Sequence, residues 1–178
     1  MLEWILDREG HEFLIQVDRA YIKDKFNLTG LKEKFIRELN SKDDEVFDKR
    51  FKQYIKHLYK SAEPRPEHLQ DEKYLQFIQD IVDVYGMIHN RFIRTPEGMA
   101  RMVNKYLEGG FGYCPRALCD NQKCLPCGLS EKLRNSRVKI FCPKCEEVYM
   151  VQKANRSREG GVITATNLDG SYFGQSFP

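Results

Sequence analysis

The chain has 178 residues, of which 41% are hydrophobic and 31% are charged, and its formal net charge is +3. This length allows one large domain or two small ones, and the composition is typical of a globular chain that can bury a core. No run of about 18 apolar residues is long enough to span a membrane, and the N-terminus lacks the pattern of a secretory signal. We therefore expect an intracellular protein without a membrane partner.

The first 109 residues are predicted to form a helical domain. Asp18 is a candidate N-cap for a short helix over residues 20–26, which the turn-forming segment 27–30 ends. Between residues 31 and 59, apolar side chains recur at spacings of three and four, which is typical of amphipathic helices. Pro64 and Pro66 then interrupt the helical pattern.

The strongest helical pattern covers residues 67–91 and is followed by a clear start signal for another helix. A wide apolar stripe runs along the first of these helices and comprises Tyr74, Phe77, Ile78, Ile81, Val82, Tyr85, Ile88 and Phe92. In the second, Thr95 is the expected N-cap, Pro96 the first helical residue and Glu97 a favourable charge in the first turn. Gly109 and Gly110 should end it.

After Gly110 the sequence changes from helical to β-prone. The segments 138–141 and 148–151 are short and rich in β-branched and aromatic residues, which predicts two strands. Residues 153–171 are polar and contain glycines, so a mobile loop is expected there. The aromatic pair Tyr172 and Phe173 could pack back on this second domain as a structural clasp. The second half is also basic, with ten Lys and Arg against six Asp and Glu in residues 110–178.

All six cysteines of the chain lie between residues 114 and 145. In a reducing compartment, clustered cysteines at short spacings indicate metal ligands rather than disulfides. Spacing mildly favours one set of four, namely Cys124, Cys127, Cys142 and Cys145. Local sequence favours another, because an aromatic residue, a cysteine, a proline and a basic residue occur in the same order at 113–116 and at 141–144. That second set is Cys114, Cys119, Cys142 and Cys145.

Either set would make a structural site, because four cysteine ligands leave no open position on a tetrahedral zinc ion. The pair Cys124 and Cys127, if unused, would be free thiols or a weak two-ligand site. Their spacing resembles a redox motif, but the surrounding βαβ pattern is missing. No phosphate-binding loop, nucleophile elbow or kinase catalytic loop occurs. The histidines are expected to be structural, at the surface or half-buried: His11, His57, His68 and His89.

Several segments in this order closely resemble the regulatory β subunits of casein kinase II. They are DKFNLTGL at 24–31, YGMIHNRFI at 85–93, GGFGYCPR at 109–116, FCPKC at 141–145 and DGSYFG at 169–174. The resemblance implies an α+β fold, with an all-helical domain over residues 1–109 and a small zinc-ribbon-like β domain over residues 110–178. It also implies one structural zinc ion per chain, bound by Cys114, Cys119, Cys142 and Cys145.

The same resemblance implies a non-catalytic subunit that dimerises through the zinc domain. Its expected partners are a second copy of itself, the catalytic alpha subunit of casein kinase II and protein substrates, in cytoplasm and nucleus. We place the dimer interface on Pro115, Leu118, Leu129, Val148 and Tyr149. One alternative is a purely structural dimerisation module. The other is a nucleic-acid-binding ribbon that uses Lys132, Arg134, Arg137 and Lys139, but nucleic acid is not expected as a partner because stacking aromatic residues are lacking.

The chain also departs from the family pattern. Cys124 and Cys127 are not cysteines in the usual family form, and the phosphorylated N-terminal serines of the family have no counterpart. In the stretch 61–73, which corresponds to the acidic loop of the family, basic residues interrupt the acids, so control by polyamines is not expected. The family continues beyond Pro178 with a hairpin that grips the catalytic subunit. Without that hairpin, weaker binding of the catalytic subunit is expected.

Overall fold

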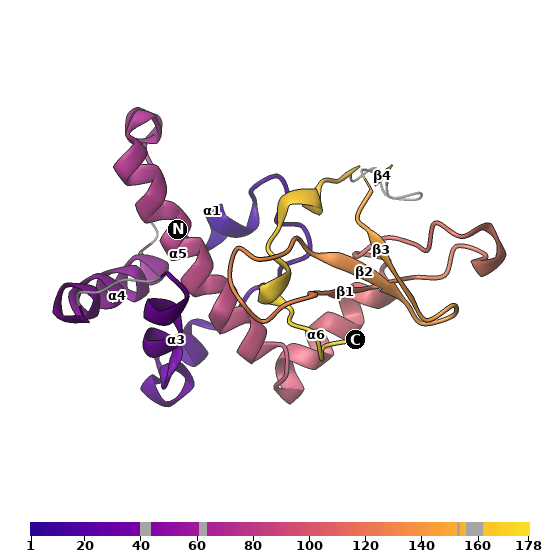
Figure 1. Ribbon diagram of the computed structural model, residues 1–178, viewed down its shortest axis with the longest axis horizontal. Helices are drawn as coiled ribbons and strands as arrows, with labels where there is room; N and C mark the ends of the chain where they lie inside the picture. The colour runs from indigo at the N-terminus through magenta and orange to yellow at the C-terminus, as the bar shows by residue number, and fades with distance from the viewer. Residues whose placement is uncertain (40–43, 61–63, 153, 156–161) are drawn as a thin grey trace.

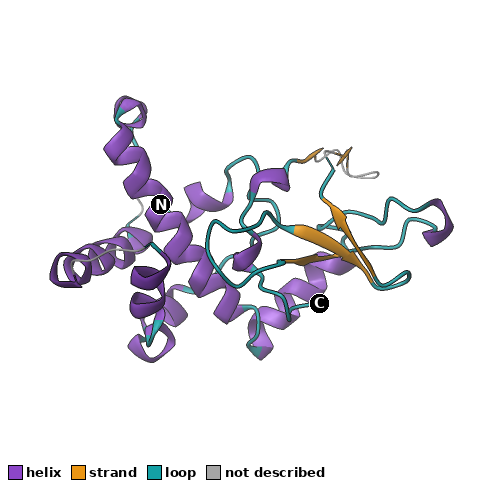
Figure 2. Cartoon of the chain, in the orientation of Figure 1, coloured by secondary structure: helices purple, strands orange, loops and turns teal. Residues whose placement is uncertain are grey.

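The computed structural model describes residues 1–39, 44–60, 64–152, 154–155 and 162–178. The expected α+β class is confirmed, because helices fill the first part of the chain and a small antiparallel sheet follows (Figures 1 and 2). The α-helices are α1 (Leu2–Leu6), α2 (Arg19–Lys23), α3 (Leu31–Glu38), α4 (Asp44–Tyr59), α5 (Glu72–Phe92) and α6 (Pro96–Leu107). The strands are β1 (Leu125–Cys127), β2 (Lys139–Cys142), β3 (Glu147–Met150), β4 (Ala154–Asn155) and β5 (Val162–Ile163).

Helix α5 is the centre of the helical region. Most of its predicted apolar stripe is buried, and Ile81, Tyr85 and Ile88 have no exposed surface, while Tyr74 and Phe77 are half-buried. Helices α3 and α4 pack on it, and the rings of Phe35 and Tyr54 meet edge to face with centroids 6.0 Å apart. Burial of these large side chains, at roughly 1.5–3 kcal/mol each, is the main source of stability in this region.

An extended segment near the N-terminus lies along α5 and is held by polar side chains of that helix. The Tyr85 hydroxyl donates to the carbonyl of Ile15 at 2.6 Å, and the backbone N–H of Ile15 donates to His89 Nε2 at 3.2 Å. His89 Nδ1 lies 2.9 Å from the carbonyl of Tyr172, so Nδ1 carries the proton. His89 is fully buried, which corrects the expectation of a surface or half-buried residue.

The three-stranded sheet has the order β1-β2-β3 and is antiparallel throughout. Ile140 of β2 pairs with Pro126 on one side and with Tyr149 on the other. Strands β2 and β3 match the two predicted strands to within one residue at each end. Strand β1 was not predicted, because its three residues, Leu125 to Cys127, include a proline that is unusual inside a sheet. Strands β4 and β5 form a separate two-stranded pair.

Residues 169–174 form a C-terminal clasp that packs on α5, between this helix and the sheet (Figure 1). Tyr172 and Phe173 are buried, and the Tyr172 hydroxyl donates to Asp83 Oδ1 at 2.6 Å. Gly86 permits this contact, since a Cβ there would lie 2.0 Å from the Tyr172 ring. The clasp therefore joins the two regions, whereas the sequence suggested that the aromatic pair packs on its own domain.

Local capping explains where the helix boundaries differ from the prediction. The Asp24 side chain accepts the N–H of Phe26 and starts a separate 3-10 turn over Lys25–Leu28, so α2 ends at Lys23. Likewise, Pro66–Gln70 is a 3-10 turn, and α5 starts only after Asp71, which accepts the N–H of Lys73. Asp is a favoured N-cap, and a new cap defines a new helix start. The predicted Thr95 cap is confirmed by its bond from the N–H of Gly98.

The predicted mobile loop over residues 153–171 is partly ordered. Within it the structure shows β4, β5 and 3-10 turns at Ala165–Asn167 and Gly170–Tyr172, while residues 153 and 156–161 lie outside the described residues. The 61–73 stretch is described only from residue 64 onward. The boundary at residues 109 and 110 stays a prediction. No helix in the described ranges is both long and apolar enough to cross a bilayer.

Candidate metal centre

The first cysteine pair is carried by a closed loop. Cys114 follows Tyr113, which forms an isolated β-bridge with Lys123, and the N–H of Cys114 donates to the carbonyl of Gln122 at 2.8 Å. Cys119 ends the 3-10 turn Ala117–Cys119, and its carbonyl accepts the N–H of Gln122 at 3.0 Å. These bonds fold the five-residue step from Cys114 to Cys119 back on itself, so both sulfurs can reach one point.

The second pair lies at the β2–β3 hairpin. Cys142 is the last residue of β2 and is fully buried, and its carbonyl accepts the N–H of Glu146 at 2.8 Å. Glu146 has a φ of 58°, in the left-handed region that lets the chain reverse into β3. The tight turn places Cys145 beside Cys142.

The four sulfurs of these pairs form one group. Their Sγ atoms all lie within 4.8 Å of one another. Across the two loops, Cys114 and Cys145 are 3.9 Å apart, and Cys119 and Cys142 are 4.0 Å apart. Bonds of about 2.3 Å from zinc to sulfur in a tetrahedron imply sulfurs about 3.8 Å apart. The spacing is far too long for a disulfide of about 2.05 Å. The group is thus able to hold a tetrahedral thiophilic metal ion.

Two thiols of this group have strongly shifted pKa values, which a bound cation would change. Burial raises the pKa of the Cys119 thiol to about 12, so this sulfur stays protonated unless a positive ion compensates. The Tyr149 hydroxyl, 3.3 Å from Cys145 Sγ, lowers the pKa of Cys145 to about 6 by hydrogen bonding. This contact of Tyr149 was not predicted from the sequence. The only hint in the sequence is that Tyr149 follows Cys145 by four residues. A dication at this point would draw protons from the thiols and bind the thiolates.

Cys124 and Cys127 do not belong to the metal-holding group found among the described residues. Both are buried, at 1% and 4% exposure, and neither is in a disulfide. Burial raises the pKa of Cys124 to about 12 and that of Cys127 to about 11, which makes unreactive thiols. The structure thus brings together the set that the resemblance implies, and not the set that spacing alone mildly favours.

The residues expected at a dimer interface are largely at the surface of the sheet region. Leu118 is 76% exposed, Leu129 52% and Val148 43%, and Pro115 is also exposed. Tyr149 is half-buried against Cys145. Four of the five are therefore accessible for contact with another molecule, while Tyr149 also belongs to the metal centre.

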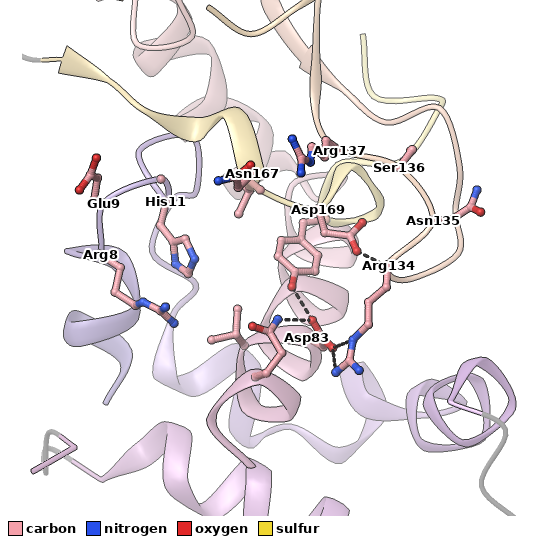
Figure 3. A pocket seen from close by; sticks show the side chains of 15 residues that line it. Arg8, Glu9, His11, Asp83, Arg134, Asn135, Ser136, Arg137, Asn167 and Asp169 are labelled. Atoms are coloured by element: carbon pink, nitrogen blue, oxygen red, sulfur yellow. Dashed lines mark hydrogen bonds and ion pairs between the residues drawn. The ribbon is translucent and has the colours of Figure 1, made fainter. Parts of the chain in front are cut away.

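The basic residues proposed for nucleic-acid binding do not form a free face. Arg134 reaches back to α5, where its Nη2 lies 2.6 Å from Asp83 Oδ2 (Figure 3) and 3.1 Å from Asp80 Oδ1. Asp83 has no exposed side-chain surface, so this arginine compensates a buried charge. Lys139 Nζ contacts Met150 Sδ on the neighbouring strand. Two of the four basic residues are thus engaged within the protein.

Known proteins with similar sequences identify the family of this chain. A family model described as casein kinase II regulatory subunit matches residues 1–178. The chain is 35% identical over 178 residues to casein kinase II subunit beta of Schizosaccharomyces pombe, and 36% identical to casein kinase II subunit beta' of Drosophila melanogaster. It is 38% identical to a putative casein kinase II subunit beta-4 of Arabidopsis thaliana. Each match covers 99% of this chain, which spans 66%, 70% and 55% of these relatives, respectively.

Proposed function

Because the chain belongs to the family of casein kinase II regulatory subunits, we propose that it is a non-catalytic subunit that scaffolds and modulates the catalytic Ser/Thr kinase subunits. The observation that carries the proposal is the group of four cysteine sulfurs within 4.8 Å, in a chain matched over its whole length by the family model. The sequence contains no phosphate-binding or catalytic-loop signature, which supports a regulatory rather than a catalytic role.

In this proposal Cys114, Cys119, Cys142 and Cys145 bind one structural zinc ion per chain. Four protein ligands complete a tetrahedral shell, so the ion serves folding and not catalysis. Four thiolates around a dication leave a net negative charge, and basic residues of the two loops reduce it. Lys144 lies at this site, with its Nζ 2.7 Å from Asp120 Oδ2 of the other loop.

The zinc region would also carry the dimer interface. Strand β3 is at the edge of the sheet, and Val148 and Met150, two residues apart on one face, are 43% and 58% exposed. Apolar side chains exposed on an edge strand favour association with another chain. A two-fold axis would use the patch of Pro115, Leu118, Leu129, Val148 and Tyr149 twice.

Light scattering tests this placement. Val148→Glu and Leu129→Glu should each shift the protein from dimer to monomer, while zinc stays bound. Leu75→Glu is a matched control, because Leu75 is 45% exposed on α5, outside the proposed interface. An intact dimer in both interface variants would refute the placement.

The kinase partner is tested by calorimetry with the catalytic alpha subunit of casein kinase II. The chain with zinc bound should give saturable binding, and Cys142→Ser should lose it together with the metal. Absence of binding by the zinc-loaded dimer would refute the scaffolding function and leave a structural dimerisation module. We further propose that protein substrates of the kinase are partners of this subunit in cytoplasm and nucleus, the reducing compartments that suit its free thiols.

A further inference from the structure

A cavity lies where the helical region meets the sheet region. It has a volume of about 700 Å3 and is lined by the N-terminal segment around Arg8 and His11, by α5 around Asp83, and by the loops around Arg137 and Asn167 (Figure 3). This volume falls in the range of small-molecule sites. The metal centre does not contribute to the lining.

The acidic groups on the wall of this cavity already have donors. Asp83 Oδ1 accepts from Tyr172 at 2.6 Å and from Gln79 at 3.0 Å, and its Oδ2 accepts from Arg134 at 2.6 Å. Asp169 accepts the backbone N–H groups of Arg134 and Ser171. The Glu9 carboxylate points away from the cavity in Figure 3. The acids of the wall therefore have little capacity left to bind a cation.

Two guanidinium groups on the lining are available as donors. The side chains of Arg8 and Arg137 form no hydrogen bond or ion pair with other described residues, and they reach the cavity from different segments of the chain (Figure 3). Arg8 packs on the Trp4 ring, with 4.9 Å from its Cζ to the ring centroid, which fixes the guanidinium and leaves its N–H groups free. The Ser136 hydroxyl, on the same wall as Arg137, is buried without a partner in the described structure.

His11 adds an acceptor to this set of donors. Its Nδ1 lies 2.7 Å from the carbonyl of Ile5 and must donate, since a carbonyl only accepts. Burial lowers the pKa of His11, so the ring is neutral at pH 7 and its Nε2 offers a lone pair. A ligand with anionic oxygens and one hydroxyl would satisfy both arginines and this nitrogen.

We propose that the cavity is a binding site for a phosphate monoester, held between Arg8 of the helical region and Arg137 of the sheet region. The phosphoryl oxygens match the planar fork of each guanidinium, which binds phosphate through two N–H groups. A monoester is mainly a dianion at pH 7, because its second pKa is near 6, and a hydroxyl of its organic part can donate to His11 Nε2. The site is independent of the proposed kinase-regulating function.

The test is calorimetry on the full zinc-loaded chain with two probes, glycerol 2-phosphate and a short phosphoserine peptide. Arg8→Gln and Arg137→Gln should each weaken binding at least tenfold. Arg50→Gln, an exposed arginine of α4 outside the cavity, should leave the affinity unchanged. Both mutated side chains are exposed, so the fold should persist, and circular dichroism together with zinc content checks that it does.

Each outcome decides the proposal. Tighter binding of the free ester would assign the site to a small metabolite, and tighter binding of the peptide would assign it to a phosphorylated partner. Either result supports a phosphate site if the arginine variants weaken it. The proposal is overturned if neither probe binds, if Arg50→Gln weakens binding as much as Arg8→Gln, or if a peptide with glutamate in place of phosphoserine binds equally well.

Discussion

In the helical region, the fully buried Phe35 packs on Phe51 and Tyr54 between α3 and α4, and Tyr85 and Ile88 are fully buried on α5. The three-stranded sheet itself is small. Its three main strands contain three, four and four residues, and on β3 both Val148 and Met150 are exposed. The two cysteine loops next to the sheet enclose a group of sulfurs instead of an apolar core. A core of large apolar side chains can stabilise a fold by itself, but a sheet of this size requires additional stabilisation, such as a bound metal ion.

The two regions meet through polar contacts as well as apolar ones. The clasp places Tyr172 and Phe173 on α5, and Arg134 pairs with buried Asp83 of the same helix. Substitution of a metal ligand should therefore reduce stability most. Substitutions in the helical core should follow, and substitutions of the buried polar contacts that join the two regions should have smaller effects.

The largest effect is expected from loss of a metal ligand. Cys142→Ser should release zinc and unfold the sheet region while the helical region keeps its circular dichroism signal. Structural zinc supplies about 10–16 kcal/mol in zinc-finger peptides, more than a small sheet can replace. Zinc content per chain and amide hydrogen exchange measure the two parts of this prediction. Cys127→Ser is the control and should keep the metal. Zinc loss in Cys127→Ser with retention in Cys114→Ser would favour the other ligand set.

Truncation of a side chain in the helical core should destabilise the helical region and leave the metal bound. Phe35→Ala removes a fully buried ring that packs on Phe51 and Tyr54, and we expect a loss of about 3–5 kcal/mol in the free energy of unfolding. Zinc should stay bound at temperatures below the transition. Leu75→Ala, at a residue 45% exposed on α5, should change the unfolding free energy by only about 0.5 kcal/mol. If Phe35→Ala released the metal, the two regions would not be stabilised separately.

The pH dependence of stability should reveal His89, which touches both regions. Burial lowers its pKa to about 4, and both ring nitrogens are already used as a donor to Tyr172 and an acceptor from Ile15. The folded state therefore keeps His89 neutral while the unfolded chain takes up a proton below about pH 6.5.

Stability should be full above pH 6.5 and fall by about 3 kcal/mol as the pH drops to about 4. Urea denaturation across this range measures the slope, and His89→Gln should flatten it. His57→Gln is the control, since His57 lies on α4 away from the clasp. An unchanged slope in His89→Gln would show that other groups, such as the cysteines, cause the loss.

The smallest effect is expected from the clasp hydroxyl. Tyr172→Phe keeps the buried ring but removes the donor to Asp83 Oδ1, which then accepts only from Gln79, while Oδ2 still accepts from Arg134. The loss should be about 1–3 kcal/mol, because a hydrogen bond to a buried charge is removed. Tyr74→Phe, at a half-buried tyrosine of α5, is the matched control. Equal denaturation midpoints for the two variants would mean that the Tyr172 hydroxyl does not stabilise the contact between the clasp and α5.

Features that depend on neighbouring residues could be predicted from the sequence. The stripe on α5, the Thr95 cap and the strands β2 and β3 follow from periodicity, capping and β-propensity, all of which act over a few residues. The boundaries of α2 and α5 were missed because Asp24 and Asp71 start new turns in competition with the longer pattern. Strand β1 was missed because three residues with a proline carry almost no strand signal.

The sequence by itself determined the family resemblance, the helical and β-prone halves, and a cluster of six cysteines able to supply metal ligands. Spacing alone mildly favoured another cysteine set, and the tertiary structure brings together the four sulfurs that the resemblance implies, although Cys119 and Cys142 are 23 residues apart in the chain. The same holds for the bond of Tyr172 to Asp83 across 89 residues, and for that of Arg134 across 51. Local patterns fix the turns and helix faces, but contacts between distant residues depend on how those elements pack, which no short segment encodes.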